Sequence, residues 1–520
     1  MQKLELTWIG KGQEPAVEPR ILLHDPSRDY GDPDSENMLI HGDNLLALKA
    51  LEQKYAGKVK CIYIDPPYNT GNAFDKYDDA LEHSIWLNLM KQRLDLLYKL
   101  LSEDGVFFCN LDEQEHAYLK VMLDEVFGRK NYIGDIIWRK RKGGGNDSRF
   151  IALDHDYIIV YVKSSSKEIH ARKWRVTQNE DYLKRYCEVD ENGNRFYWDT
   201  LARDGLQNPI PISVTCPDGS ILSINSQKSS STIEDGLASG TIRLIRGRNG
   251  WTLHHRIYMP TGQVLRSVLE DVGTNKTAGD EMKYLFNDSK AFPYPKPESL
   301  IQRLLELNTA PGDLVLDSFL GSGTTAAVAQ KMGRRWIGIE LGDHCYTHCI
   351  PRLQKVVDGE QGGISQSVGW QGGGGFKFYE LAPTLIVKDR YGNQVIDAER
   401  YSPEMLAAAV AKLNGYYYAP DATIFWKQGH SQESSYIFTT TTYLSARQLD
   451  EIAREVSPAE TLLICCPAFD NGLNTRYDNI TIKKIPQSVL DKCEYGKDHY
   501  DLNIIDVPEP DEEDEEVDDE

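Results

Sequence analysis

The chain has 520 residues, which predicts three or four domains, and its 40% apolar and 10% aromatic content suffices for a sizeable buried core. No run of about 18 apolar residues exists that could span a membrane, and the nine cysteines are scattered and odd in number, so we expect a cytoplasmic protein with reduced thiols and no membrane partner. The net charge of -21 argues at first sight against a nucleic-acid partner, but its distribution along the chain reverses that interpretation.

After a polar arm at residues 1–36, residues 37–140 alternate strands with helices. Alternation of this kind predicts an α/β fold in which crossover helices join the strands of a parallel sheet. The expected elements are a strand at Val59–Ile64, a helix at Leu81–Leu101, a strand at Gly105–Cys109, a helix at Glu113–Phe127 and a strand at Tyr132–Trp138.

A basic, glycine-rich segment, Arg139–Asn146, interrupts this pattern. Short strands, turns and aromatic residues follow it, which predicts an inserted β-rich domain over residues 141–285. Between Arg129 and Arg266 the chain has 22 Lys and Arg against 15 Asp and Glu. A phosphate-binding surface needs clustered positive charge rather than a positive total, so the insertion is the expected nucleic-acid-binding module.

The α/β pattern resumes over residues 286–360. A glycine-rich linker at 361–376 then leads to an α+β domain at 377–506, which we expect to contact other proteins, and to an acidic tail at 507–520, which we expect to be disordered. The elements expected in the resumed pattern are a helix at Pro297–Leu307, a strand at Asp313–Asp317, a helix at Thr324–Met332, a strand at Arg335–Ile339 and a helix at Asp343–Val357.

The first chemical motif is Asp65-Pro66-Pro67-Tyr68, at the carboxyl end of a predicted strand. Prolines end the strand and fix φ, so the Asp65 side chain and the Pro66 carbonyl would project rigidly above the sheet. An exocyclic amino group has two hydrogens, which a carboxylate and a carbonyl can hold while the nitrogen attacks. A tyrosine beside them offers a stacking face for a base taken out of a duplex. The alternative interpretation is a strand that merely ends in a proline turn.

The second motif is the glycine-rich turn at Asp317–Thr325 (DSFLGSGTT), between a predicted strand and a predicted helix. Its glycines let the backbone approach a ligand, and the helix start beyond it presents free N–H groups. The missing third glycine of GxGxxG counts against a nicotinamide cofactor, and the turn is not a GxxxxGK[ST] phosphate loop. Glu340 ends the next strand, where its carboxylate could accept both hydroxyls of a ribose or simply start a helix.

In this order, the two motifs and the basic segment between them resemble the β class of DNA amino-methyltransferases, which use S-adenosylmethionine. The resemblance covers about residues 37–360. It implies a Rossmann-like methyltransferase domain that is split in sequence by a target-recognition domain. The sequence DPPY implies adenine N6 as the target, with cytosine N4 as the alternative.

A narrower resemblance joins the chain to the modification subunits of Type III restriction systems. It rests on Asn69-Thr70-Gly71, which extend the first motif, and on the C-terminal domain. It implies a homodimer that acts on double-stranded DNA and a separate helicase–nuclease subunit as partner. A solitary methyltransferase is the alternative, and methylation of RNA or protein fits the basic insertion less well.

The class resemblance also implies a role for each motif residue. Asp65 and the Pro66 carbonyl would bind the target amino group, Pro67 would complete the rigid turn, and Tyr68 would stack on the flipped base. The methyl group would pass directly from sulfonium to nitrogen without a cysteine nucleophile. The residues implied for the cofactor site are Asp43, Lys296, Pro297, Asp317, Phe319, Gly321, Gly323, Thr324 and Glu340.

Seven basic residues are candidate DNA contacts, although each one could instead be a solvated surface charge. They are Lys140, Arg141, Lys142, Arg149, Arg243, Arg246 and Arg248. The stretch His344–Cys349 has a spacing of His and Cys that can hold zinc, but its helix should pack on the sheet, so we expect no metal.

Overall fold

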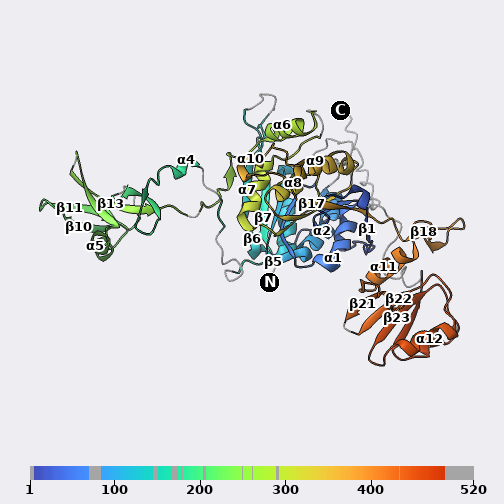
Figure 1. Ribbon diagram of the computed structural model, residues 1–520. Coiled ribbons are helices and arrows are strands. Elements are labelled where there is room, and N and C mark those ends of the chain that lie inside the picture. The colour runs from blue at the N-terminus through green and yellow to red at the C-terminus, as the bar shows by residue number, and fades with distance from the viewer. Residues whose placement is uncertain are drawn as a thin grey trace, which may run out of the picture. The chain divides into compact units, whose positions relative to one another are not determined.

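The structure is a computed structural model that describes residues 5–68, 83–143, 150–166, 174–176, 180–202, 207–248, 250–260, 262–287, 292–432 and 434–486. The chain forms two compact units (Figure 1). The larger unit contains Met1–Lys173 and Arg266–Glu520, and the smaller unit contains Trp174–Leu265. In the described ranges, no helix is both long and apolar enough to cross a membrane.

The larger unit is built on an 11-stranded sheet with the strand order β1-β17-β3-β16-β15-β4-β5-β7-β6-β14, in which β2 pairs with β17. Strands β3, β16, β15, β4 and β5 are parallel, so their carboxyl ends lie along one edge of the sheet. The strands are β1 (Leu22–His24), β2 (Tyr30–Gly31), β3 (Met38–His41), β4 (Val59–Ile64), β5 (Leu101–Leu111), β6 (Tyr132–Arg139), β7 (His155–Val162), β14 (Val268–Leu269), β15 (Leu314–Asp317), β16 (Arg335–Glu340) and β17 (Gly375–Leu381).

Helices connect these strands and supply most of the remaining core. One continuous apolar cluster joins β4 and β5 to α1, α2 and α3. Helix α1 begins at Asn44 because Asp43 caps it, with Oδ1 accepting from the Leu46 N–H at 3.0 Å. The helices are α1 (Asn44–Tyr55), α2 (His83–Leu100), α3 (Glu113–Leu123), α6 (Asn275–Phe286), α7 (Glu298–Asn308), α8 (Thr324–Lys331), α9 (Ile350–Val357) and α10 (Ser365–Val368).

The predicted α/β pattern is confirmed, but β7 changes two details of it. This strand runs antiparallel between β5 and β6, so the sheet is mixed rather than parallel throughout. It also places residues 155–162 in the central sheet, and the separate unit at 174–265 is therefore shorter than the predicted insertion at 141–285. The end of β7 reads IIVYV and is buried on both faces, as is typical of a central strand.

Two further boundaries differ from the expectations. Strands β1 and β2 in the predicted arm pair with β17, which itself spans the predicted border between the glycine-rich linker and the C-terminal domain. The helix expected over Asp343–Val357 begins with a π-helical turn at Cys345–Cys349 before α9. Backbone pairing between segments more than 340 residues apart leaves no local sequence pattern that could predict it.

The smaller unit is β-rich, as predicted. A four-stranded sheet in the order β12-β13-β9-β8 and a two-stranded hairpin, β10-β11, enclose a small core with α5 (Figure 1). Its elements are α4 (Glu180–Leu183), β8 (Glu188–Val189), β9 (Arg195–Thr200), β10 (Ile210–Thr215), β11 (Ile221–Ser226), α5 (Ser230–Ala238), β12 (Ile242–Gly247) and β13 (Gly250–Tyr258).

The C-terminal part of the larger unit has the predicted α+β composition, and the acidic tail lies outside the described residues. A five-stranded sheet in the order β20-β21-β22-β23-β24 packs with α11 and α12, beside the hairpin β18-β19. The elements are β18 (Ile386–Lys388), β19 (Gln394–Ile396), α11 (Pro403–Leu413), β20 (Tyr417–Tyr418), β21 (Gly429–Gln432), β22 (Ser435–Thr439), α12 (Ala446–Glu455), β23 (Thr461–Cys466) and β24 (Ile480–Lys484).

A buried ion cluster ties α7, α8 and α9 together. Glu298 lies 2.7 Å from the Lys331 ammonium and 2.9 Å from the Arg352 guanidinium. Burial acts to raise the pKa of Glu298, but the two cations and their hydrogen bonds hold it below its usual value. Arg352 also donates to Thr324 Oγ1 at 2.8 Å, so the cluster supports the start of α8.

Replacing Arg352 with methionine should therefore destabilise the larger unit strongly. We expect Arg352→Met to lower the free energy of unfolding by about 3 to 5 kcal/mol, because it leaves a buried carboxylate short of one partner. Urea denaturation of the full chain measures the change. The matched control is Arg447→Met, which removes an exposed arginine that lies 3.2 Å from Glu451 and should change stability little. Equal losses of unfolding free energy in the two variants would contradict a stabilising role of the buried ion cluster.

Candidate active site

The acidic residues of the predicted motifs meet at the carboxyl edge of the central sheet. Asp43 follows β3, Asp65 follows β4, Asp317 ends β15 and Glu340 ends β16. The parallel pairing of these four strands brings together residues that are up to about 300 positions apart in the chain. Ligands of open α/β sheets bind at this edge.

The Asp65–Tyr68 turn is held by hydrogen bonds on both sides. Tyr68 Oη donates to Asp65 Oδ1 at 2.6 Å, and the Lys296 ammonium binds Asp65 Oδ2. Trp86 Nε1 donates to the Pro67 carbonyl at 2.7 Å. Burial, and then the charge of Asp65, raise the pKa of Tyr68 well above its usual value, so its hydroxyl stays protonated and remains a donor.

Asn110 is a further residue of this site that the sequence analysis missed. It lies near the end of β5 and is fully buried. Its Nδ2 donates to Tyr68 Oη and, at 3.4 Å, to Asp65 Oδ1, whereas its Oδ1 has no hydrogen-bond partner in the described part of the chain. The available signal was an amide at the carboxyl end of an otherwise apolar run, Val106–Leu111.

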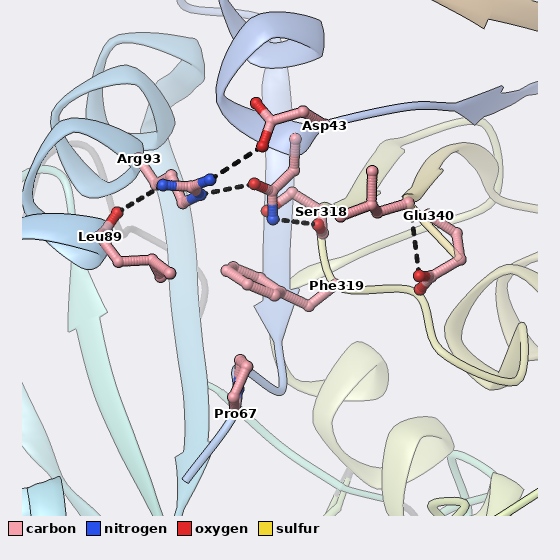
Figure 2. A pocket seen from close by; sticks show the side chains of 9 residues that line it. Asp43, Pro67, Leu89, Arg93, Ser318, Phe319 and Glu340 are labelled. Atoms are coloured by element: carbon pink, nitrogen blue, oxygen red, sulfur yellow. Dashed lines mark hydrogen bonds and ion pairs between the residues drawn. The ribbon is translucent and has the colours of Figure 1, made fainter. Parts of the chain in front are cut away.

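A pocket lies beside this turn and shares Pro67 with it. Arg93 reaches into it from α2, where it lies 3.1 Å from Asp43 Oδ2 and donates to the Leu89 carbonyl at 2.8 Å (Figure 2). The Phe319 ring extends from the glycine-rich turn into the same space (Figure 2). The lining residues are Asp43, Asn44, Pro67, Leu89, Arg93, Ser318, Phe319, Glu340 and Leu341.

The glycine-rich turn is fixed by Glu340. This carboxylate accepts from the Gly321 N–H at 2.6 Å, the Leu341 N–H at 2.8 Å and the Gly342 N–H at 3.0 Å. Gly321 has φ +56° and Gly323 has φ +83°, which are left-handed values that favour glycine. Glu340 thus borders the pocket and also sets the path of the turn.

Asp317 lies behind the pocket wall and has no cationic partner in the described contacts. It accepts from the Phe319 N–H at 2.9 Å and from Thr325 Oγ1 at 2.6 Å. Burial raises the pKa of Asp317 to about 7, although these two hydrogen bonds act in the opposite direction. Its carboxyl group therefore supports the turn and is partly protonated near neutral pH.

The structure divides the predicted cofactor residues into three places. Asp43, Phe319 and Glu340 line the pocket, whereas Asp317, Gly321, Gly323 and Thr324 form the turn behind it. Lys296 and Pro297 form the third place. Pro297 caps α7, the Lys296 carbonyl accepts from Thr324 Oγ1 at 3.2 Å, and the Lys296 side chain binds Asp65 at the Asp65–Tyr68 turn.

The pocket residues fit S-adenosylmethionine. Leu89, Phe319 and Leu341 offer apolar surface for a flat base, and the Asp43 and Glu340 carboxylates can accept hydrogen bonds from hydroxyl groups. Ser318 Oγ is buried and has no hydrogen-bond partner in the ranges that the structure describes, so a polar ligand would satisfy it.

The candidate DNA contacts differ in their surroundings. Lys140 lies 2.5 Å from Asp156 and is largely buried, whereas Arg141 and Lys142 are exposed. Arg149 lies outside the described residues, as do Asn69, Thr70 and Gly71. Arg243 and Arg246 lie on opposite faces of β12, and Arg248 is exposed beyond the end of the strand.

The His and Cys residues of the π-helical turn contact the pocket wall from behind. Cys349 Sγ donates to the Gly321 carbonyl at 3.1 Å, and His344 Nε2 lies 2.9 Å from Glu340 Oε1. These contacts give the stretch a role in supporting the glycine-rich turn.

Comparison with known proteins agrees with this geometry. Residues 59–349 match the model of the N6/N4 methyltransferase family, described as DNA methylase. The chain belongs to this family. The family depends on S-adenosylmethionine, and the resemblance predicted from the order of the motifs is confirmed.

Several relatives are modification subunits. The chain is 34% identical over 406 residues to the probable type III restriction-modification enzyme HindVI Mod subunit of Haemophilus influenzae, covering 67% of this chain and 54% of the relative. It is 28% identical over 363 residues to the StyLTI Mod subunit of Salmonella typhimurium, covering 62% and 55%. It is 26% identical over 480 residues to the EcoP15I Mod subunit of Escherichia coli, covering 75% and 72%. The chain thus spans about half the length of the first two.

The raised pKa of Asp317 predicts a pH-dependent change in stability. The folded chain keeps this proton between about pH 4 and pH 7, where the unfolded chain has already lost it. The group therefore costs stability as the pH rises through that window, and the cost is complete above it. Asp317→Asn cannot titrate. Its amide oxygen can still accept from the Phe319 N–H, and its NH2 group can donate to Thr325 Oγ1, which reverses the direction of that bond. Its free energy of unfolding should rise relative to the parent by a few kcal/mol across the window, at about 1.4 kcal/mol per pKa unit.

Urea denaturation at intervals between pH 4.5 and pH 8 (roughly the window of the shift) measures this trend. Asp389→Asn is the control, because the Asn393 side chain and nearby backbone N–H groups hold the pKa of Asp389 below its usual value. Its difference from the parent should not rise with pH. A flat difference for Asp317→Asn would show that the carboxyl group is ionised throughout.

Proposed function

We propose that this chain methylates the N6 amino group of an adenine in double-stranded DNA, with S-adenosylmethionine as methyl donor. The observation that carries the proposal is the shared position of Pro67. It belongs to the turn that presents Asp65 and Tyr68, and it also lines the pocket that fits the cofactor. A base held at the turn and a cofactor held in the pocket would therefore be neighbours.

The residues of the turn supply alignment and charge placement. Asp65 would accept a hydrogen bond from the amino group and stabilise the positive charge that grows on the nitrogen as it attacks. Tyr68, kept neutral and fixed by Asn110, would stack on the base once it leaves the duplex. When bound, S-adenosylmethionine supplies an electrophilic methyl group. The nitrogen loses its extra proton afterwards, so Asp65 need not be a strong base.

Removing the Asp65 carboxylate should abolish methylation while the fold is retained. We expect Asp65→Ala to lower the rate of N6-methyladenine formation by at least about 100-fold, the usual effect of losing one charge-stabilising group. Single-molecule modification sequencing of DNA from cells that express the chain measures the product, its base and its sequence together.

Asp95→Ala is the matched control for this experiment, because Asp95 is a half-exposed carboxylate on α2 that lies 2.6 Å from Lys91. It should methylate normally. Full activity in Asp65→Ala would overturn the catalytic assignment, and N4-methylcytosine in place of N6-methyladenine would overturn the choice of base.

We also propose that the smaller unit contacts DNA through one face of its four-stranded sheet. Arg243 stacks on Trp198 with its guanidinium 4.0 Å from the ring centroid, and Arg256 lies 5.6 Å from the same ring. The alternate residues Ile242 and Leu253 pack into the core on the other face. The resulting basic and aromatic surface suits phosphates and bases.

Arg243→Ala should weaken DNA binding by about tenfold, which corresponds to roughly 1.4 kcal/mol, and should reduce the dependence of affinity on salt. Fluorescence anisotropy with a duplex that contains the methylated sequence measures both quantities. Arg447→Ala removes an exposed arginine of the C-terminal domain and serves as the control. Unchanged affinity in Arg243→Ala would exclude this face as a DNA contact.

We infer further that the chain serves as the modification and recognition subunit of a restriction system, and that it forms a homodimer. Support comes from the relatives at 26–34% identity, which are named as Mod subunits. Co-purification with the product of a neighbouring helicase–nuclease gene tests the partner, and sedimentation equilibrium tests the dimer. A chain that methylates DNA and has no such neighbour would favour a solitary methyltransferase.

A further inference from the structure

The ammonium group of Lys296 occupies a specific place in the candidate active site. It binds Asp65 Oδ2 and lies 5.2 Å from the centroid of the Tyr68 ring. The Lys296 side chain is 9% exposed and that of Asp65 is 22% exposed, so the contact is largely shielded from water. An N–H donor thus lies close to both the carboxylate and the aromatic ring of the Asp65–Tyr68 turn.

These are the two groups that the proposed reaction requires for its target. The amino group of the base would donate to Asp65, and the base itself would lie against Tyr68. Tyr68 and Asn110 already donate to the other oxygen of Asp65. The oxygen that binds Lys296 is therefore the one on which a new donor would have to be accommodated.

The charge of Lys296 decides whether it can stay during the reaction. The attacking nitrogen becomes positively charged, and two unit charges about 4 Å apart repel by about 4 kcal/mol at a dielectric constant of about 20. An ammonium left on Asp65 would oppose the charge that Asp65 is placed to stabilise. Its departure from the carboxylate before methyl transfer would remove this repulsion.

The backbone around Lys296 confines such a movement to its side chain. Pro295 and Pro297 flank it and are both buried, and its carbonyl accepts from Thr324 Oγ1 at 3.2 Å. The four-carbon stem of lysine has free rotation that a short side chain would lack. The segment can thus keep its place while the ammonium swings away.

We propose that Lys296 is a displaceable occupant of the target-amine position, whose ammonium neutralises Asp65 until the amino group of the flipped base replaces it. The inference rests on the proposed adenine methylation and assigns Lys296 as a positioning residue rather than a cofactor ligand. Its consequence is that the amino group gains little net affinity in the parent, because each contact it makes with Asp65 replaces one made by lysine.

The experiment compares two duplexes in each protein. One carries adenine at the methylated position found by sequencing, and the other carries purine, which lacks the amino group. Binding is measured by fluorescence anisotropy with S-adenosylhomocysteine present, so no transfer occurs. Purine also pairs more weakly with thymine and leaves the duplex more easily, but this effect is the same for every protein. The change in the ratio of the two affinities relative to the parent therefore isolates the contact of the amino group with the protein. In Lys296→Met this ratio should rise about tenfold in favour of adenine, because the amino group gains a hydrogen bond to Asp65 Oδ2 without displacing lysine.

The controls separate this role from a structural one. Lys296→Arg keeps a cation on Asp65 and should retain the parental ratio. Damage to the fold would weaken both duplexes equally and leave the ratio unchanged, and Lys296→Gln provides a second neutral variant if the methionine variant does not fold. An unchanged or lower ratio in folded neutral variants would overturn the proposal, since lysine would then assist the amino group. Failure of adenine methylation itself would appear separately, as absence of the product in the parent.

Discussion

Parallel strand pairing imposes the constraint on which the rest of this site depends. Because β3, β16, β15 and β4 end at the same edge, four acidic residues lie there: Asp43, Asp65, Asp317 and Glu340. Four carboxyl groups in one shielded region would repel one another strongly if all were ionised and unpaired. Each of these carboxyl groups has a different set of partners, and these contacts define the site.

Asp43 is paired with a buried arginine, Arg93, and Asp65 with a lysine from a segment 231 residues further along the chain. Glu340 accepts three backbone N–H groups. Asp317 has only neutral donors in the described contacts, and it is the one whose pKa rises to about 7. At Asp317 the neutral hydrogen bonds offset the cost of burying a charge only in part, so its pKa stays raised.

The sequence analysis found the parts of the site that depend on local pattern. Strand Val59–Ile64 and the proline turn after it are visible as an apolar run with a stop, and they lie where predicted. The glycine-rich turn has the same kind of local signal. Asn110 and Arg93 were missed because one belongs to a strand and the other to a helix whose patterns are dominated by apolar neighbours. Their roles depend on which strands become neighbours.

Lys296 shows a second limit of prediction from the sequence. The class resemblance implied a cofactor role for Lys296 and Pro297, which stand upstream of the glycine-rich turn in the sequence. The Lys296 side chain instead crosses to Asp65, and only its backbone carbonyl contacts the glycine-rich turn. A residue can therefore be placed correctly in its segment and still bind a partner from the other half of the chain, since sequence order does not fix the direction in which a long side chain extends.

For the basic residues of the insertion, too, their number in the sequence says less than their positions in the structure. The excess of Lys and Arg between residues 129 and 266 predicts an attraction for phosphates, yet Lys140 is already paired with the buried Asp156. Arg243 is instead exposed and stacks on the ring of Trp198 on one sheet face, with the largely buried Arg256 beside the same ring. What makes a surface suitable for nucleic acid is the placement of cations that remain accessible on it, and in this protein that placement follows from the period of two along β12 and β13.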